Sequence, residues 1–148
     1  MVLYTIGYEG LDQEQFMAHL SHYGVDVVAD VRKLPLSRKK GFSKTTLKEM
    51  LNNRSIEYFN FQGLGAPKEF RNELYESGNY DRFFKKYLKI ISDKQDLLEA
   101  IHMLINQGKN VSLLCFERNP QQCHRKVVAD EIKKLDGNGL EIKHIVPL

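Results

Sequence analysis

The sequence predicts a single α/β domain with a mostly parallel sheet that carries helices on both faces. Short apolar runs alternate along the chain with segments of helical periodicity, which is the order of strand–helix–strand units. The chain has 148 residues, the size of one domain, and its 42% hydrophobic and 28% charged residues are ordinary globular values. No internal repeat or low-complexity segment divides it, so we expect one domain over residues 1–148.

The strands are expected where apolar residues follow one another without a helical spacing. The first begins at Val2 and stops before the turn-like segment Gly7-Tyr8-Glu9-Gly10. The second ends at Val31 and is a nearly continuous apolar run, typical of a strand buried on both faces. The expected strands cover residues 2–6, 25–31, 56–61, 111–116 and 141–146.

The helices are expected between these strands, where apolar residues recur every three or four positions. Asp12 is a suitable N-cap for the first helix, and Ser43 or Thr45 for the second. For the last helix, Asn119-Pro120 supplies an N-cap and a first position. The expected helices cover residues 12–23, 43 or 45 to about 53, 68–76, 79–108 with a break near Ser92, and 119–135.

Polar residues follow three of the expected strands at their carboxyl ends. Glu9 follows the first strand, Arg32 the second and Glu117 the fourth. In a parallel sheet these ends lie on one edge, and ligands bind outside that edge. We therefore expect the functional site there, with Glu9 and Glu117 as candidate general bases or water-positioning groups.

Residues 111–125 concentrate reactive side chains, including both cysteines. Cys123 is expected in the first turn of the following helix, where free amides and the helix dipole lower the pKa of a thiol and make it a candidate nucleophile. The alternative is a small buried core residue, which is also the expected state of Cys115. His124 is either a general acid or base near neutral pH or a structural residue on the apolar stripe of its helix.

The net charge of +3 comes from one part of the chain. From Arg32 to Lys44 there are six basic residues and no acidic one, which leaves 16 basic against 19 acidic residues elsewhere. Arg32, Arg38 and Arg125 suit bidentate contacts to phosphate or carboxylate groups. A small anionic ligand, of phosphate or nucleotide type, is therefore the expected partner.

Two other classes of function remain open. The basic window, with Phe42 available to stack on a base, also suits a nucleic-acid-binding module whose groove would continue to the lysines of residues 85–89. The third class is a structural or interaction domain. In that case Arg32 forms only a salt bridge to Asp30 or Glu9, and the window is a solvated loop.

Several known site types do not match the sequence. The spacing C-x7-C-H lacks the close cysteine pair of a zinc site, and the adjacent side chains of Cys123 and His124 rarely serve one ion, so neither a metal nor a cofactor is expected. The cysteine-phosphatase and sulfurtransferase loop needs an arginine six residues after its cysteine, where this chain has Gln121 or Ala129. No phosphate-binding P-loop or G-x-G-x-x-G motif is present.

Composition also predicts the location of the protein. The sequence has no run of 18 apolar residues, so no membrane contact is expected. Its first ten residues suggest a strand rather than a signal peptide. Two cysteines do not make the disulfide framework of a secreted protein, so we expect a cytoplasmic protein with reduced thiols.

Four sequence blocks, in order, resemble the domain of unknown function 488 family. They are T-I-G-Y-E-G at residues 5–10, D-V-R with P-x-S-R and G-F at residues 30–42, Leu64-Gly65, and L-L-C-F-E with P-x-x-C-H-R at residues 113–125. The resemblance implies a compact α/β domain with a suspected enzymatic role and no established reaction. The motif positions that it implies are Tyr8, Glu9, Asp30, Arg32, Ser37, Arg38, Cys115, Glu117, Cys123, His124 and Arg125.

Residues and resemblance together lead to one main hypothesis, an enzyme-like domain with an anionic ligand at the carboxyl edge of its sheet. The expected catalytic side chains are Cys123, His124, Glu117 and Glu9. The expected ligand-binding residues are Tyr8, Asp30, Arg32, Ser37, Arg38 and Arg125.

Overall fold

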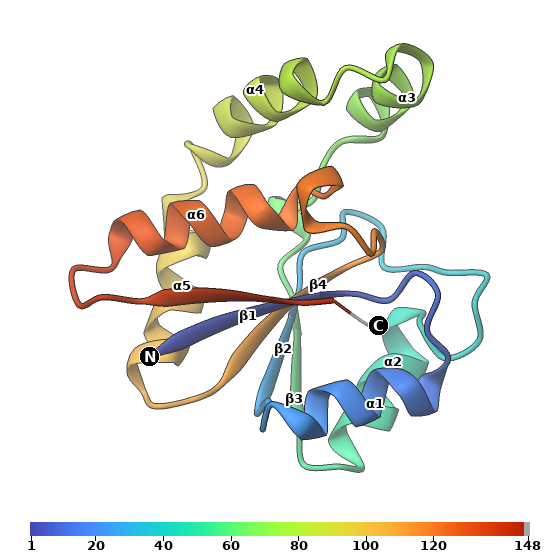
Figure 1. Ribbon diagram of the computed structural model, residues 1–148, viewed down its shortest axis with the longest axis vertical. Helices are drawn as coiled ribbons and strands as arrows, with labels where there is room; N and C mark the ends of the chain where they lie inside the picture. Colours follow the sequence, from blue (N-terminus) through green and yellow to red (C-terminus); the bar gives the residue numbers. More distant parts are fainter. Residues whose placement is uncertain (147–148) are drawn as a thin grey trace.

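The computed structural model describes residues 1–146 and contains a five-stranded sheet with the strand order β3-β2-β4-β1-β5 (Figure 1). Every neighbouring pair of strands is parallel. The prediction of a mostly parallel α/β sheet is therefore confirmed. The strands are β1 (Val2–Gly7), β2 (Val27–Asp30), β3 (Glu57–Asn60), β4 (Val111–Cys115) and β5 (Glu141–Ile145).

Helices cover both faces of the sheet, as predicted (Figure 1). One face carries α1 (Gln13–His22) and α2 (Lys44–Asn52), and the other carries α5 (Gln95–Asn106) and α6 (Arg125–Leu135). A hairpin of α3 (Lys68–Ser77) and α4 (Tyr80–Ile91) packs outside α6. Successive strand residues face opposite sides, so the core has two halves: Leu113 points into one and Leu114 into the other.

Local sequence signals account for most of the element boundaries. Asp12 caps α1 in a reciprocal capping box, because its carboxylate accepts the Gln15 amide at 2.8 Å and the Gln15 side chain accepts the Asp12 amide at 3.0 Å. The expected break near Ser92 is confirmed, since α4 ends at Ile91 and α5 begins at Gln95.

The prediction of one helix from residue 119 to residue 135 is wrong. Asn119 and Pro120 begin only a short 3-10 helix, η2 (Pro120–Gln122), whose first turn Asn119 caps. Cys123 then adopts an extended conformation with φ −130° and ψ 140°, and α6 begins two residues later. Cys123 therefore precedes α6 and does not occupy its first turn, although the amide of Arg125, the first residue of α6, lies 3.5 Å from its Sγ.

The strand order brings the chemically active segments together. Strand β4 lies between β1 and β2, and the register places Gly7 opposite Cys115 and Asp30 opposite Leu114. Past the strand ends, the Glu9 amide donates to the Phe116 carbonyl at 2.8 Å. The expectation that the carboxyl ends of these three strands share one edge is confirmed. Among the helices of residues 1–146, none is both long and apolar enough to span a membrane.

Candidate functional site

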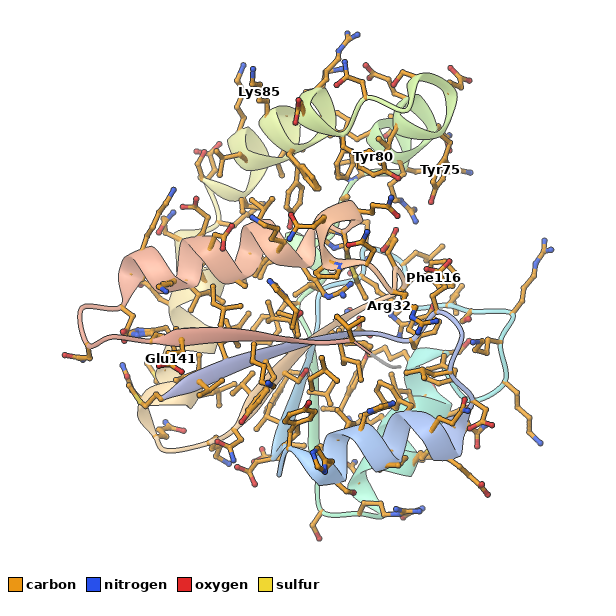
Figure 2. All side chains as sticks on the ribbon, viewed as in Figure 1. Arg32, Tyr75, Tyr80, Lys85, Phe116 and Glu141 are labelled. Carbon is orange, nitrogen blue, oxygen red and sulfur yellow. A yellow bond between two sulfur atoms is a disulfide. The ribbon has the colours of Figure 1, made fainter. Side chains whose placement is uncertain are left out.

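A pocket of about 840 Å³ opens at the carboxyl edge of β1, β2 and β4. Its walls come from the segments after these strands, from α3 and from the start of α6. Figure 2 shows Arg32 and Phe116 at this edge and Tyr75 facing it from α3. The lining residues are Tyr8, Arg32, Lys33, Leu34, Leu36, Ser37, Arg38, Ala66, Arg71, Tyr75, Cys115, Phe116, Glu117 and His124.

A buried ion pair forms the wall beyond β2. The Arg32 guanidinium donates from Nη2 to Asp30 Oδ2 at 2.7 Å and from Nε to Asp30 Oδ1 at 2.9 Å. The Tyr58 hydroxyl donates to the same carboxylate at 2.5 Å, and burial together with the charge of Asp30 raises the pKa of Tyr58. Burial by itself lowers the pKa of Arg32, but its bonds to Asp30 raise it above its ordinary value. The salt bridge between Arg32 and Asp30, one of the alternatives for Arg32, is therefore formed, and the paired Arg32 still lines the pocket.

Part of the basic window, residues 32–44, has a structural role. Phe42 is fully buried and stacks on Tyr8 with ring centroids 4.6 Å apart, so the expectation that it stacks on a nucleic-acid base is wrong. Lys39 Nζ donates to the Leu11 carbonyl at 2.7 Å and to the Tyr8 carbonyl at 3.2 Å. The Ser37 hydroxyl lines the pocket and accepts the Lys39 amide at 3.1 Å.

Arg125 is an internal cation and does not line the pocket. Its guanidinium donates to Thr5 Oγ1 at 3.1 Å, to the Glu117 carbonyl at 2.5 Å, to the Arg118 carbonyl at 3.2 Å and to Cys115 Sγ at 3.2 Å. Burial lowers the pKa of Arg125 to about 10. These bonds hold the loop after β4 against β1, so the donors that Arg125 was expected to offer a bound anion are occupied by protein groups.

The two candidate carboxylates have different surroundings. Glu9 is exposed, and its Oε1 accepts the Arg118 amide at 2.9 Å, so it orients the loop after β4. Glu117 lines the pocket, with its Oε2 3.5 Å from Cys115 Sγ. Burial raises the pKa of Glu117, and the positive charges of Arg125 and Arg71 act in the opposite direction. Of the two candidate carboxylates, Glu117 is therefore the one that lies in the pocket.

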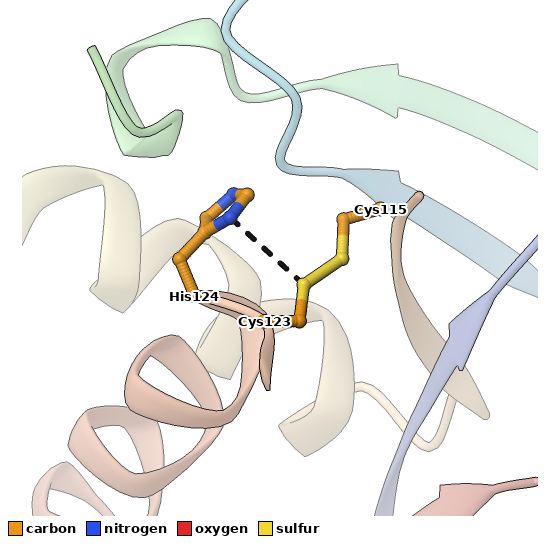
Figure 3. A group of neighbouring side chains, drawn as sticks. All are labelled: Cys115, Cys123 and His124. Carbon is orange, nitrogen blue, oxygen red and sulfur yellow. Dashed lines mark hydrogen bonds between the residues drawn. A yellow bond between two sulfur atoms is a disulfide. The ribbon is translucent and has the colours of Figure 1, made fainter. Parts of the chain in front are cut away.

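The two cysteines meet beside the pocket. Cys115 Sγ and Cys123 Sγ are joined as a disulfide, so the expectation of reduced thiols, with Cys123 as a free nucleophile, is not met in this structure. Both residues are 1% exposed, and Cys115 lines the pocket. The extended backbone at Cys123 and the helical backbone at His124 turn both side chains to the same side (Figure 3). Adjacent cysteine and histidine side chains rarely serve one ion, but here Cys123 Sγ and His124 Nδ1 lie 3.9 Å apart.

His124 is held by a backbone carbonyl. Its Nε2 lies 2.8 Å from the Val31 carbonyl oxygen, which only accepts hydrogen bonds, so Nε2 carries the proton. Its Nδ1 therefore presents a lone pair, 3.9 Å from Cys123 Sγ (Figure 3). Burial lowers the pKa of His124 to about 4, so the ring is neutral at neutral pH.

Sequence reasoning missed Arg71 and the apolar mouth of the pocket. Arg71 extends from α3 into the pocket, and its Nε is a buried donor that has no hydrogen-bond partner within residues 1–146. Nothing in the local sequence distinguishes it from other surface arginines, because the hairpin of α3 and α4 places it there. The mouth consists of four large apolar side chains that remain at least 43% exposed: Leu34, Leu36, Tyr75 and Phe116.

Comparison with known proteins identifies one family. The family model described as "Domain of unknown function DUF488" matches residues 12–132, which is most of the chain. No curated protein matches the chain, and no solved structure does.

Proposed function

The chain belongs to the DUF488 family, and because that description names no reaction, we propose from the pocket itself that the protein is an enzyme acting on a phosphate-bearing ligand of nucleotide type. The ligand binds at the carboxyl edge of the sheet. Arg38, Arg71 and Lys33 bind its anionic group, with the Ser37 hydroxyl beside them, and Glu117 is the acid or base.

The observation that carries this proposal is the unsatisfied Nε of Arg71. A buried donor without an acceptor costs about 1–3 kcal/mol, so proteins rarely retain one without reason. An oxygen of a bound anion provides the missing acceptor, and arginine suits phosphate because it donates in a planar fork. Lys33 and Arg38 line the same pocket, are exposed, and form no ion pair with another residue in the described part of the chain.

The mouth of the pocket supports a ligand that is not only an anion. Tyr75 is 70% exposed and Phe116 is 43% exposed, and both line the pocket near its cations. Exposed apolar side chains gathered around a polar pocket are typical of a ligand site. An aromatic base stacks on such side chains, whereas inorganic phosphate does not. A nucleotide therefore fits the pocket better than a free phosphate.

The catalytic assignment is based on position. Glu117 is the carboxylate among the lining residues, and its Oε2 lies 3.5 Å from Cys115 Sγ. The protonated nitrogen of His124 is occupied by the Val31 carbonyl, and Glu9 is occupied by the Arg118 amide, so neither is as well placed to exchange a proton with a ligand. Tyr8 and the Asp30–Arg32 pair shape the wall against which the ligand lies.

A nucleic-acid-binding module receives less support. Such a module needs a basic groove that continues from the window to the lysines of α4, but Figure 2 shows Lys85 at the top of the molecule, well separated from Arg32 near its middle. Lys86 is already paired with Glu73 at 2.7 Å. Because Phe42 is buried as well, the observations favour a closed pocket for a small ligand.

Isothermal titration in low-salt buffer tests the proposal, with adenosine monophosphate, inorganic phosphate and adenosine as probes. We expect the nucleotide to bind most tightly. Arg71→Gln should weaken its binding by roughly 10- to 100-fold, since a hydrogen bond to a charged group contributes about 1.5–3 kcal/mol. The matched control is Arg54→Gln, which removes an exposed arginine before β3, at the opposite edge of the sheet, and should leave binding unchanged.

Two results would contradict the proposal. One is equal binding of the nucleotide by the wild type and by an Arg38→Gln/Arg71→Gln double variant. The other is the absence of measurable binding of both phosphate-bearing probes to the folded wild-type protein.

A further inference from the structure

We propose that Cys115, Cys123 and His124 form a binding site for one divalent metal ion of zinc type when the two cysteines are reduced. The three residues come from the end of β4 and from the two positions before α6. Metal binding at this point goes beyond the anion-binding function and does not depend on it.

The three ligand atoms already lie at the spacing that one ion requires. Cys115 Sγ, Cys123 Sγ and His124 Nδ1 are all within 4.8 Å of one another, and Cys123 Sγ lies 3.9 Å from His124 Nδ1. In a tetrahedral zinc site, bond lengths of about 2.3 Å to sulfur and about 2.0 Å to nitrogen separate the sulfur and nitrogen ligands by about 3.6 Å. Small side-chain adjustments therefore bring the imidazole into coordination.

A hydrogen bond to the backbone orients the imidazole of His124 for metal binding. Metal-binding histidines usually donate their other ring nitrogen to a carbonyl or carboxylate, which fixes the tautomer and the ring orientation. His124 does this through Nε2 and the Val31 carbonyl, 2.8 Å apart. The lone pair of Nδ1 is consequently held toward the two sulfurs, and the neutral ring is the form that binds a metal.

The sulfurs also have the donors that stabilise thiolates. Arg125 Nη1 lies 3.2 Å from Cys115 Sγ, and the Arg125 amide lies 3.5 Å from Cys123 Sγ. In the loaded site these N–H groups donate to the coordinated sulfurs, as hydrogen-bond donors around metal-bound cysteines do. Two thiolates also cancel the charge of a divalent ion, so the loaded site adds no net charge beside the pocket.

The disulfide and the metal site are alternative states of the same residues. The Cα atoms of Cys115 and Cys123 are 7.5 Å apart, whereas most disulfides join Cα atoms about 4.4–6.8 Å apart. The backbone thus already holds the pair at a wide spacing, and two sulfurs on one tetrahedral ion need to be about 3.8 Å from each other. A phosphine reduces the disulfide to two thiols and becomes the phosphine oxide with an oxygen from water. Metal binding then releases the two thiol protons.

The ligand set leaves one position of the ion open toward the pocket. Two cysteines and one histidine form a three-ligand set, which is typical of zinc sites that keep a fourth position for water or substrate. Cys115 and His124 both line the pocket, and Glu117 Oε2 lies 3.5 Å from Cys115 Sγ. An ion at this point therefore faces the pocket with the Glu117 carboxylate beside its open position, where a bound water could be activated.

Cobalt binding tests the site without any anionic ligand. The protein is reduced with tris(2-carboxyethyl)phosphine under anaerobic conditions and titrated with Co²⁺. We expect one ion per chain, intense visible bands of tetrahedral Co²⁺ and a near-ultraviolet sulfur-to-cobalt charge-transfer band, all displaced by Zn²⁺. The oxidised protein should show none of these bands, because its sulfurs are bonded to each other.

The variants distinguish ligands from bystanders. Cys115→Ser and His124→Gln should each weaken Co²⁺ binding by more than about 100-fold, since even outer-shell partners contribute about 10- to 100-fold. Glutamine still reaches the Val31 carbonyl, which favours a folded variant. His22→Gln, at an exposed histidine of α1, should bind Co²⁺ like the wild type.

Three results would overturn the site: a reduced wild type without the bands, His124→Gln with undiminished Co²⁺ affinity, or equal losses in His124→Gln and His22→Gln. If a variant does not fold, a labelling experiment on the wild type alone still tests the metal site. Zn²⁺ must then protect Cys115 and Cys123 of the reduced protein from iodoacetamide, as mapped by mass spectrometry, and equal labelling with and without Zn²⁺ refutes the proposal. Because no anion is present, a failure here is separate from a failure of the nucleotide titration.

Discussion

Replacing Asp30 by asparagine should destabilise the protein strongly, because Asp30 is the countercharge of a buried arginine. Its side chain is fully buried, and that of Arg32 is 6% exposed. The carboxylate accepts from Nε and Nη2 of Arg32, from the Arg32 amide at 3.1 Å and from the Tyr58 hydroxyl. Asparagine has nearly the same shape but carries no charge and has only one acceptor oxygen.

The expected loss follows from the burial of both partners. Removing one member of a buried ion pair leaves an uncompensated charge and costs about 3–5 kcal/mol. Domains of this size are stable by about 5–15 kcal/mol, so the loss is a large part of the total. With a urea m-value of about 2 kcal/mol per molar, the midpoint of unfolding should fall by roughly 1.5–2.5 M.

Urea unfolding of the wild type and of Asp30→Asn at neutral pH measures this difference. The control is Glu73→Gln, because Glu73 is 36% exposed and pairs with Lys86, which is also 36% exposed. An exposed pair contributes about 0–1 kcal/mol, so the control should shift the midpoint little. A loss below about 1 kcal/mol in Asp30→Asn would refute the reasoning. A paired Asp30→Leu/Arg32→Met variant should be more stable than Asp30→Asn, since it leaves no unpaired charge.

Two further predictions concern positions away from this ion pair. Gly7→Ala should destabilise the protein by about 3 kcal/mol or more and lower its melting temperature, because a Cβ atom there would lie 1.7 Å from the Glu117 carbonyl oxygen. The control Gly137→Ala should change the melting temperature little, because a Cβ atom there meets no atom within 4 Å. Similar melting of both variants would contradict this. The hydrogen bond from His102 lowers the pKa of Asp136, so this carboxylate stabilises the fold above its unfolded pKa, and the contribution disappears as the pH falls through the lower folded value. Asp136→Asn should therefore melt below the wild type at pH 6 and converge with it in strong acid, and a difference that does not depend on pH would exclude this cause.

Local patterns in the sequence were enough to predict the sheet, its helices and the edge that carries the site. Apolar runs and helical spacing depend on which face of an element is buried, and that information is present in a few neighbouring residues. Once the strands are parallel, Glu9, Arg32 and Glu117 must lie at one edge. The alternation of strands and helices predicts that parallel arrangement without further knowledge of the packing.

Local patterns failed where a neighbouring element competes with them. Asn119 and Pro120 signal a helix start correctly, but the helix lasts one turn, because the chain must become extended at Cys123 before α6 begins. The loss of that first turn moves Cys123 out of the helix and places its sulfur against Cys115. No short-range signal contains this information.

Strand and helix patterns are enough to say which kinds of side chain lie at the carboxyl edge, but which of them line the pocket depends on how distant elements pack. Arg125 and Arg71 are both arginines in or near a helix, yet Arg125 has its donors occupied inside the protein, whereas Arg71 reaches the pocket with an unpaired Nε. Cys115 and His124 meet because β4 and α6 pack together. The physical reason is that burial, hydrogen-bond partners and charge pairing depend on contacts between elements far apart in the chain, and residue type and local periodicity do not contain those contacts.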